Sequence, residues 1–396
     1  MSILIAIDLR PLIEPFESGV TVYTKAMVAQ FQRMKGVGDK DVELLLFYQS
    51  GRRCERIHKL FPKVRYVKVS TTWHRLRSLF AFPNLPGAYF VAKRGGRQPA
   101  NAKQPDLIFM PDRRPFYKTK IPVVLTVHDL VPEKHSGTLS WKGRLWFKIF
   151  SLKRLLKISS GVLTPTLSVA NELAAYLPKR MRRRLKREAT YEGAKLAAKM
   201  VAPKDAKRLS KKPFFFMLSP ADPRKRADWV LDMAQRFPRI NFAIVGVKKG
   251  DKRFSKARSR LRRRKSQANL FIFGQVSEQE KLWFFKNAHA LLALSKYEGF
   301  DLPVLEAVEA KCAVIMSDIV VHRELYRKGV FVKDKAALQV AIYNSLQGGS
   351  RSGGRTGSRK TTRKLRIPNP RGHYTWEAAA KRSLLFFRRV IADKNR

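Results

Sequence analysis

Cysteine, acidic side chains and long apolar runs are all scarce in this chain of 396 residues. The two cysteines, Cys54 and Cys312, lie far apart, and no His/Cys cluster has zinc spacing, which indicates reduced thiols rather than a metal site. No apolar stretch approaches the roughly 18 residues that a membrane-spanning helix needs. Residues 1–7 enter directly into a strand-like run, so we expect no signal peptide and a cytoplasmic location, with peripheral attachment to the inner face of the membrane as an alternative.

The shortage of acids leaves a large excess of positive charge. There are 82 Lys and Arg residues against 30 Asp and Glu, which gives a formal net charge of +52. The cations are concentrated at 179–187, 252–265 and 351–366, and the last of these segments is rich in Gly, Ser and Arg, which is typical of a loop. Three interpretations stay open: docking to an anionic membrane or polyanionic acceptor, a generic solvated surface, and nucleic-acid binding. In each case we expect salt-sensitive, nonspecific affinity for polyanions.

The segment 141–158 is amphipathic when it is drawn as a helix. Its apolar arc, which should face the core, consists of Trp141, Leu145, Ile149, Leu152 and Leu156. The opposite arc mixes aromatic and basic side chains: Trp146, Phe147, Phe150, Lys153, Arg154 and Lys157. That mixture suits the interface of an anionic membrane, although a domain helix whose lysines reach out to solvent is the alternative.

Short apolar runs alternate with longer mixed segments along the whole chain. The runs are typical of buried parallel strands and lie at 43–48, 107–110, 121–127, 161–164, 213–218, 241–245, 270–273, 290–294 and 313–316. Helices are predicted between them at 22–34, 166–177, 226–236, 278–287 and 303–310. This alternation predicts an α/β protein, and the length allows two domains, joined near the polar, basic segment 195–212.

A helix is predicted to begin after the apolar run 290–294 and the loop at 297–299 that follows it. Asp301 is expected to cap it, Leu302 to be its first residue, and Pro303 to occupy the first turn, where proline is tolerated. The free N–H groups and the positive end of the helix dipole would then point to the carboxyl edge of the sheet. A diphosphate would fit that field.

Two carboxylates, Glu298 and Glu306, flank this helix start. They could accept hydrogen bonds from the hydroxyl groups of a sugar and a ribose. The alternative is an ordinary turn with one solvated glutamate and one that interacts with the helix dipole. The single Asp-x-Asp motif, Asp39-Lys40-Asp41, is interpreted as a turn, so we expect no metal ion.

The chain resembles the retaining GT-B glycosyltransferases of group 1, the GT4 family, and its mannosyltransferase-like members in particular. Glu298 and Glu306 are similar in spacing to the family's Glu-x7-Glu motif. Other segments that resemble family motifs follow in family order: 1–12 with 18–24, 123–130, 161–166, 222–225 and 374–377. Asp301 stands where the family commonly has glycine, and residues 311–314 stand where it has Gly-x-Pro-Val.

The resemblance implies two Rossmann-like, doubly wound domains that face an interdomain cleft. It implies an acceptor domain at 1–195, a nucleotide-sugar domain at 196–373, and a C-terminal helix at 374–396 that crosses back to the first domain. The implied reaction is a metal-independent, retaining transfer of a hexose from GDP-mannose, our first choice of donor, or from a UDP-sugar. A lipid-linked or cell-envelope saccharide is the expected acceptor.

The resemblance also assigns roles to individual residues. His128 and Glu298 are the implied catalytic residues, and Arg224 and Lys225 would bind the departing diphosphate, which needs cations more than a strong acid. The remaining implied donor-binding residues are Gly299, Phe300, Asp301, Leu302 and Glu306, and those of the acceptor or phosphate loop are Gly19 and Asp129.

Alternatives remain for these roles. Gly19 would let the backbone approach a phosphate closely, but alone it predicts only a turn. His128 could be a structural histidine at the end of a buried strand. The whole chain could also be a catalytically idle GT-B scaffold that docks polyanions, or a transferase with a soluble acceptor.

Overall fold

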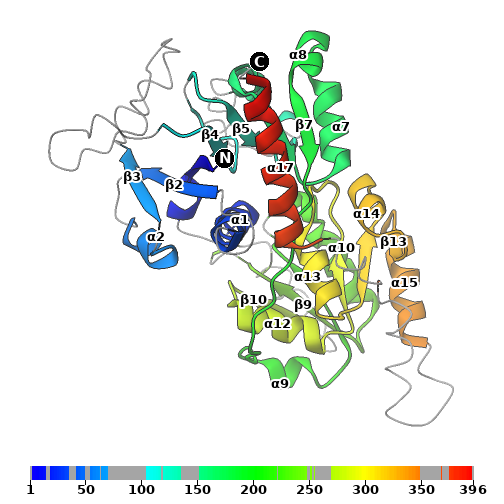
Figure 1. The fold of residues 1–396 in the computed structure, drawn as a ribbon. Coiled ribbons are helices and arrows are strands. Elements are labelled where there is room, and N and C mark those ends of the chain that lie inside the picture. Colours follow the sequence, from blue (N-terminus) through cyan, green and yellow to red (C-terminus); the bar gives the residue numbers. More distant parts are fainter. Residues whose placement is uncertain are drawn as a thin grey trace. The chain divides into compact units, whose positions relative to one another are not determined.

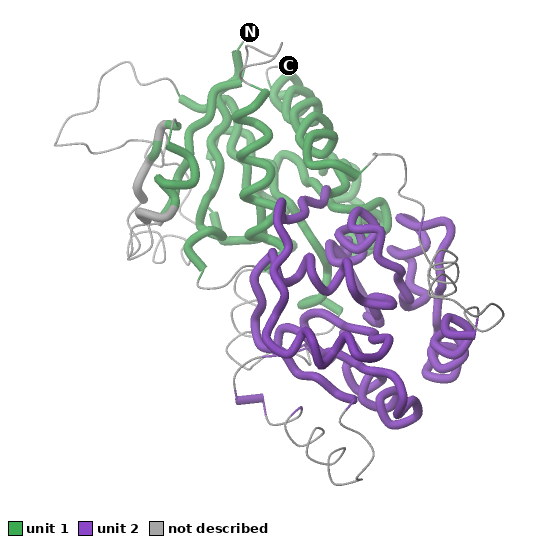
Figure 2. The backbone as a smooth tube through the Cα atoms, turned by 90° about the horizontal axis from the view of Figure 1, so that it is seen from below, with its two compact units in different colours: residues 1–192, 374–396 green, residues 193–373 purple. Residues whose placement is uncertain are grey.

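The structure is a computed structural model that describes most of the chain as two compact units (Figures 1 and 2). Unit 1 is formed by residues 1–192 and 374–396, and unit 2 by residues 193–373. The described residues are 2–14, 18–34, 42–49, 54–62, 64–69, 104–116, 119–134, 151–220, 222–247, 250–251, 254, 269–347, 367 and 374–394.

In the described part of unit 1, seven parallel strands form one sheet with the order β3-β2-β1-β4-β5-β6-β7. The strands are β1 (Ile3–Asp8), β2 (Val42–Gln49), β3 (Arg65–Val69), β4 (Leu107–Met110), β5 (Val123–Thr126), β6 (Gly161–Thr164) and β7 (Lys186–Ala189). The direction of winding reverses between β1 and β4. In doubly wound sheets, ligands bind outside the carboxyl ends of the strands at such a reversal.

The helices of unit 1 include one from each end of the chain. They are η1 (Arg10–Ile13), α1 (Gly19–Met34), α2 (Cys54–Leu60), α4 (Val131–Lys134), α6 (Leu152–Ile158), α7 (Leu167–Tyr176), α8 (Lys179–Arg184) and α17 (Trp376–Lys394). The C-terminal helix α17 packs on α1, with the ring of Phe387 6.0 Å from Phe31 and 5.1 Å from Phe109 (Figure 1). A Cβ at Gly161 would come within 2.8 Å of the Phe386 ring, so only glycine lets α17 approach β6 this closely.

Unit 2 repeats the winding with six parallel strands in its described part, in the order β10-β9-β8-β11-β12-β13. The strands are β8 (Phe214–Leu218), β9 (Asn241–Val245), β10 (Leu270–Phe273), β11 (Ala290–Ala293), β12 (Val314–Ser317) and β13 (Val330–Val332). The helices are α9 (Ala206–Leu209), η3 (Pro223–Lys225), α10 (Ala227–Arg236), α12 (Glu278–Asn287), α13 (Leu302–Glu309), α14 (Val320–Leu325) and α15 (Lys335–Gln347). The reversal of winding falls between β8 and β11.

The predicted α/β class is confirmed, as are the nine predicted strands and the five helices predicted between them. Each of the nine apolar runs forms a strand, and α1, α7, α10, α12 and α13 lie where helices were predicted. Three strands at sheet edges, β3, β7 and β13, were not predicted. Edge strands are partly solvated and need no apolar run, and β7, for example, reads Lys-Arg-Glu-Ala.

The prediction of one helix over 141–158 is wrong. Ser151 has extended backbone, with φ −61° and ψ 143°, and its side chain accepts from the N–H of Arg154, so α6 begins only at Leu152. Leu152 and Leu156 are buried, as expected, and the cations of α6 are exposed. Several other predictions fall outside the described residues: those for Trp146, Phe147, Phe150, the Asp-x-Asp turn at 39–41, 351–366, and all of 252–265 except residue 254.

Candidate active site

A pocket lies at the carboxyl edge of the unit 2 sheet, where the winding reverses between β8 and β11. Its lining comes from both strands and the loops that follow them, and includes Lys225, Ser295, Asp301 and Pro303. Of the predicted donor residues, Lys225 after β8 and Asp301 after β11 line the pocket. The others near it belong to the same two segments: Arg224 after β8, and Glu298, Gly299, Phe300 and Leu302 after β11.

Lys225 is the cation of this pocket. Its Nζ lies 2.5 Å from Oε1 of Glu298 and 3.8 Å from Oδ1 of Asp301, and its side chain is 18% exposed. Burial alone would lower the pKa of Lys225, but the charges of Asp301 and Glu298 outweigh burial and raise it. Lys225 therefore keeps its positive charge although it is largely buried.

Arg224 makes different contacts from its neighbour. Its Nε donates to Asp222 Oδ2 at 3.0 Å, and Nη1 donates to the carbonyl oxygen of Tyr297 at 3.3 Å. The backbone N–H of Lys296 donates to the carbonyl oxygen of Arg224 at 2.9 Å. Arg224 thus connects the loop after β8 to the loop after β11, whereas Lys225 lines the pocket.

The predicted capping role of Asp301 is wrong. Asp301 does precede Leu302, the first residue of α13, but its backbone is left-handed, with φ +68°, and its side chain makes no capping hydrogen bond. Its Oδ2 instead lies 3.1 Å from Nε2 of His322. A positive φ is the conformation that glycine adopts without strain.

Glu306 is turned toward a neighbouring helix. Its Oε1 accepts from Nζ of Lys281 on α12 at 2.8 Å, and only 9% of the side chain is exposed. Burial raises the pKa of Glu306, and the charge of Lys281 opposes that shift only in part. Glu306 is not part of the pocket lining. It lies on α13, about one helical turn beyond the helix start that borders the pocket.

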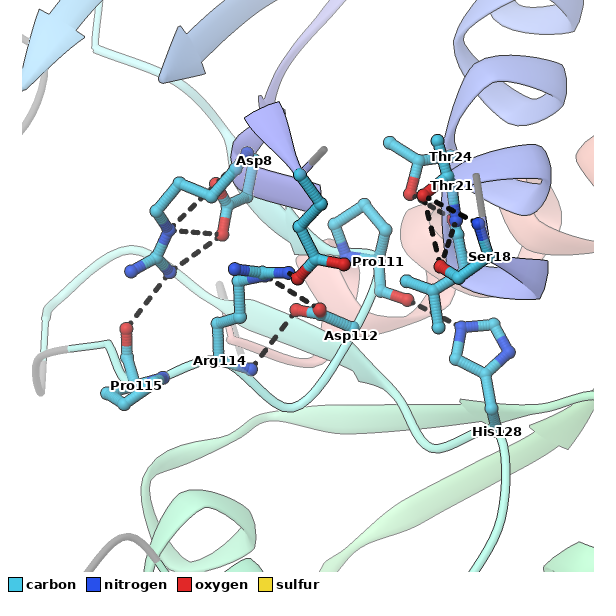
Figure 3. Close-up of polar contacts among 12 residues, drawn as sticks. Asp8, Ser18, Thr21, Thr24, Pro111, Asp112, Arg114, Pro115 and His128 are labelled. Atoms are coloured by element: carbon cyan, nitrogen blue, oxygen red, sulfur yellow. Dashed lines mark hydrogen bonds and ion pairs between the residues drawn. The ribbon is translucent and has the colours of Figure 1, made fainter. Parts of the chain in front are cut away.

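Unit 1 has a second polar cluster at its own reversal of winding, after β1 and β4 (Figure 3). Nε of Arg10 donates to Asp8 Oδ2 at 2.8 Å, and its Nη2 donates to the carbonyl oxygen of Pro115 at 3.0 Å. Nε of Arg114 donates to Asp112 Oδ2 at 2.8 Å. Burial raises the pKa of Asp112, and Arg114 opposes this. We did not predict this cluster, although one Asp-x-Arg sequence begins at the last residue of β1 and another follows β4.

His128 follows β5 and lies in the same region, with its ring turned to Pro111 (Figure 3). Nε2 lies 2.8 Å from the carbonyl oxygen of Pro111, and Nδ1 lies 3.3 Å from Oε1 of Glu192. Burial would lower the pKa of His128, but Glu192 outweighs it and raises the pKa. Glu192 was missed by sequence analysis because it follows the polar edge strand β7, where no pattern marks it.

The two predicted loop residues lie near the same edge of unit 1. Asp129 accepts from the N–H of Val131 at 3.0 Å and lies 3.6 Å from Nη2 of Arg113, so its carboxylate organises the start of α4. Gly19 is exposed and is the first residue of α1, next to Ser18, whose hydroxyl oxygen lies 3.0 Å from that of Thr21.

Two features are absent from the residues that the structure describes. No group of three or more His, Cys, Asp or Glu side chains in that part of the chain is arranged to hold a metal ion. No helix among the same residues combines the length and the apolar character needed to cross a bilayer.

Two parallel, doubly wound sheets, each with polar residues at the carboxyl edge where its winding reverses, have the architecture of the GT-B fold. Two family models agree: Glycosyltransferase Family 4 matches residues 18–184, and Glycosyl transferases group 1 matches residues 201–343. The chain belongs to the group 1 glycosyltransferases and is a glycosyltransferase enzyme. Among curated protein sequences, none matches it significantly.

Solved structures with the same fold match over nearly the whole chain. Sucrose-phosphate synthase from Thermosynechococcus elongatus has a TM-score of 0.63 at 15% identity, covering 99% of this chain and 100% of that one. Anabaena HepE in complex with UDP and glucose has a TM-score of 0.59 at 14% identity, covering 99% and 98%. The lipopolysaccharide outer core galactosyltransferase WaaB in its apo form has a TM-score of 0.57 at 12% identity, covering 99% of each chain.

Proposed function

We propose that this enzyme transfers a hexose, with mannose our first choice, from a nucleoside diphosphate sugar to a lipid-linked or cell-envelope saccharide. The transfer would retain the anomeric configuration and use no metal ion. One observation carries the proposal: Lys225, Glu298 and the first turn of α13 meet at a single pocket edge. A cation and a helix N-terminus together offer the field that a departing diphosphate needs.

Each residue has a role in this proposal. Lys225 and the N–H groups at the start of α13 bind the diphosphate, and Glu298 accepts hydrogen bonds from hydroxyl groups of the transferred sugar. Arg224 holds the two loops in register through Asp222 and Tyr297. We assign His128 to orienting the sugar, an expectation that comes from the family resemblance.

The relatives support parts of the proposal. The HepE structure contains UDP and glucose, which supports a nucleotide-sugar as donor. WaaB is named as a transferase of the lipopolysaccharide outer core, which supports an envelope saccharide as acceptor.

A surface of unit 1 supports the proposal that the acceptor is carried by an anionic membrane. Arg184 Nη2 donates to the carbonyl oxygen of Leu156 at 2.7 Å, which places α8 beside the end of α6. Neither helix contains an acidic residue, and none of the six residues of α8 is buried. We define the basic face as the exposed cations of α6 and α8 together with Lys186, which lies two residues beyond the end of α8. Its members are Lys153, Arg154, Lys157, Lys179, Arg180, Arg182, Arg183, Arg184 and Lys186. Such a surface is attracted to anionic headgroups.

The donor site can be tested with two substitutions and a panel of nucleotide-sugars. A true donor should raise the melting temperature of the purified enzyme, because it binds only the folded state. Lys225→Ala and Glu298→Ala should each lower the rate of transfer by about a hundredfold or more, as loss of one electrostatic contact to a transition state does. Lys212→Ala, which removes an exposed cation from unit 2, is the matched control and should leave the rate unchanged.

The same assay separates the alternatives. An idle scaffold that docks polyanions would show no transfer with any donor, and its polyanion binding would survive both site substitutions. Transfer to free saccharides as fast as to lipid-linked ones would contradict the proposed acceptor. The anomeric configuration of the product, read by NMR, tests retention.

A further inference from the structure

Asp301 occupies a backbone conformation that its side chain does not favour. The residue has φ +68° and ψ +65°, and its carboxylate leaves the N–H groups of α13 uncapped. Glycine would adopt this backbone without strain, so neither the turn nor the helix start explains an aspartate here. The explanation must come from what the carboxylate contacts.

The Asp301 carboxylate connects the segments that follow three strands of the sheet, β8, β11 and β12. Oδ2 lies 3.1 Å from Nε2 of His322 on α14, and Oδ1 lies 3.8 Å from Nζ of Lys225 after β8. The side chain of His322 is 0% exposed and that of Asp301 is 2% exposed. Both groups are therefore fixed by packing, and water screens their charges little.

His322 faces an acceptor at each ring nitrogen. Nδ1 lies 2.8 Å from the carbonyl oxygen of Ser317, and a carbonyl oxygen can only accept, so Nδ1 carries a hydrogen. Nε2 faces the carboxylate of Asp301, which also accepts when it is ionised. These two contacts and its complete burial hold the His322 ring against the carboxylate of Asp301.

The carboxyl groups around the pocket outnumber its lysine and arginine. The cations are Lys225 and Arg224, and the carboxyl groups are those of Glu298, Asp301 and Asp222, which pairs with Arg224. Lys225 is the cation that lines the pocket, yet it lies beside two carboxylates. Lys225 and Asp301 both line the pocket, so a phosphate bound at its edge would lie near the carboxylate as well as the cation.

This arrangement affects two ligands of the proposed reaction differently. In a nucleoside diphosphate sugar both phosphates are diesters, each with one negative charge. In the nucleoside diphosphate product the terminal phosphate is free and gains a second charge above a pKa near 6. A fixed anion at the pocket repels the product more strongly than the donor.

Resting on the proposed function, we propose that Asp301, held by His322, is a specificity-determining residue that weakens binding of the nucleoside diphosphate product relative to the sugar donor. Its role is to speed product release from a pocket whose helix N-terminus and lysine would otherwise retain the diphosphate. Glycine at this position would give the same backbone without that discrimination.

The variant Asp301→Asn tests the proposal, because asparagine has the same shape, tolerates a left-handed backbone and carries no charge. The dissociation constants of UDP and UDP-glucose, and of GDP and GDP-mannose, are measured by calorimetry at pH 8 for whichever pair the wild-type enzyme binds. The diphosphate should bind about tenfold more tightly to the variant, which is the low end of the effect of one nearby charge. The sugar donor should change by about threefold or less.

Three further measurements make the result decisive. At pH 5.5, where the terminal phosphate loses its second charge, the difference between the two ligands should largely disappear. His322→Gln, which keeps the carboxylate of Asp301 and a side chain that can donate to it, should shift diphosphate binding less than Asp301→Asn does. Asp301→Gly, free of backbone strain, should reproduce Asp301→Asn if charge is the cause.

The binding measurements distinguish an error in the role of Asp301 from an error in the proposed function. Equal shifts for donor and product, or no shift for either, would overturn the role of Asp301 while the donor site stands. If neither pair of ligands binds the wild-type enzyme at all, the proposed function itself is overturned.

Discussion

Nδ1 of His128 lies 3.3 Å from the carboxylate oxygen Oε1 of Glu192, although 64 positions of sequence separate the two residues. Nε2 of the same ring lies 2.8 Å from the carbonyl oxygen of Pro111. Both ring nitrogens are thus engaged within unit 1. In this structure His128 is held by its surroundings, and any contact with a sugar would require it to exchange one of these partners.

Glu192→Gln should make the stability of the enzyme less dependent on pH. Glu192 raises the pKa of His128, so the stabilisation is fully present below the ordinary pKa of histidine and is lost as the pH rises through the raised value. At pH 6 the substitution should destabilise by about 1–3 kcal/mol, the usual cost of a lost buried hydrogen bond. At pH 9 the melting temperatures of variant and wild type should converge.

Glu188→Gln is the control for that experiment. Glu188 pairs with Arg389 at 2.6 Å, and its side chain is 31% exposed, so its loss should change stability by about 0.5 kcal/mol or less. A pH dependence that is the same in all three proteins would contradict the role of Glu192.

Phe387→Ala should strongly destabilise unit 1. The ring is fully buried between Phe31 and Phe109, and the cavity left by its removal should lower the free energy of unfolding by about 3–5 kcal/mol. Leu385→Ala, two positions away on α17 and 62% exposed, should change stability by about 0.5 kcal/mol or less. Urea unfolding of both variants measures the contrast, and similar losses would show that α17 does not pack on unit 1 as described.

Lys281→Met should destabilise unit 2 by about 3–5 kcal/mol, because it leaves the buried carboxylate of Glu306 without its partner. The double variant Lys281→Met with Glu306→Leu should recover most of that stability, since no charge is then buried. If Glu306 also binds the donor, the double variant should fold but lose affinity for nucleotide-sugar. Thermal unfolding and donor titration of the same samples separate the two roles, and unchanged donor affinity would exclude Glu306 from the donor site.

Arg180→Ala with Arg183→Ala should weaken binding to vesicles that contain anionic lipid. Each cation near such a surface contributes about 1 kcal/mol, so the pair should account for about 2 kcal/mol, or roughly thirtyfold, at low salt. Arg327→Ala with Lys328→Ala removes the same charge from exposed positions in unit 2 and is the matched control. Equal losses in the two double variants would indicate nonspecific attraction rather than docking through the basic face.

The sequence alone predicted the elements that bury apolar runs. Phe214–Leu218 and Ala290–Ala293 are such runs, and each has all or nearly all of its residues buried in the centre of a sheet, where both faces are covered. Edge strands such as β7 escaped prediction because one side of an edge is solvated and polar residues are tolerated there. The start of α13 at Leu302 was predicted correctly from Pro303, because the fixed φ of proline suits a first helical turn.

The sequence could not predict the partners of polar side chains. Glu298 and Glu306 are alike in the motif, yet one pairs with Lys225 at the pocket and the other with Lys281 on a neighbouring helix. The cap proposed for Asp301 failed because capping rules assume an extended residue before the helix, whereas this residue is left-handed. His322 carried no signal at all, since its role arises only where β12 lies beside β11.

What the sequence by itself determined is therefore the α/β class, the central strands and the helix that begins at Leu302, because burial and local backbone preference act within short stretches of chain. Only the tertiary structure decided that Asp301 contacts His322 and that Glu192 contacts His128. Strand order sets which loops meet at the edge of a sheet, and hydrogen bonds between those loops depend on distances that no local pattern records.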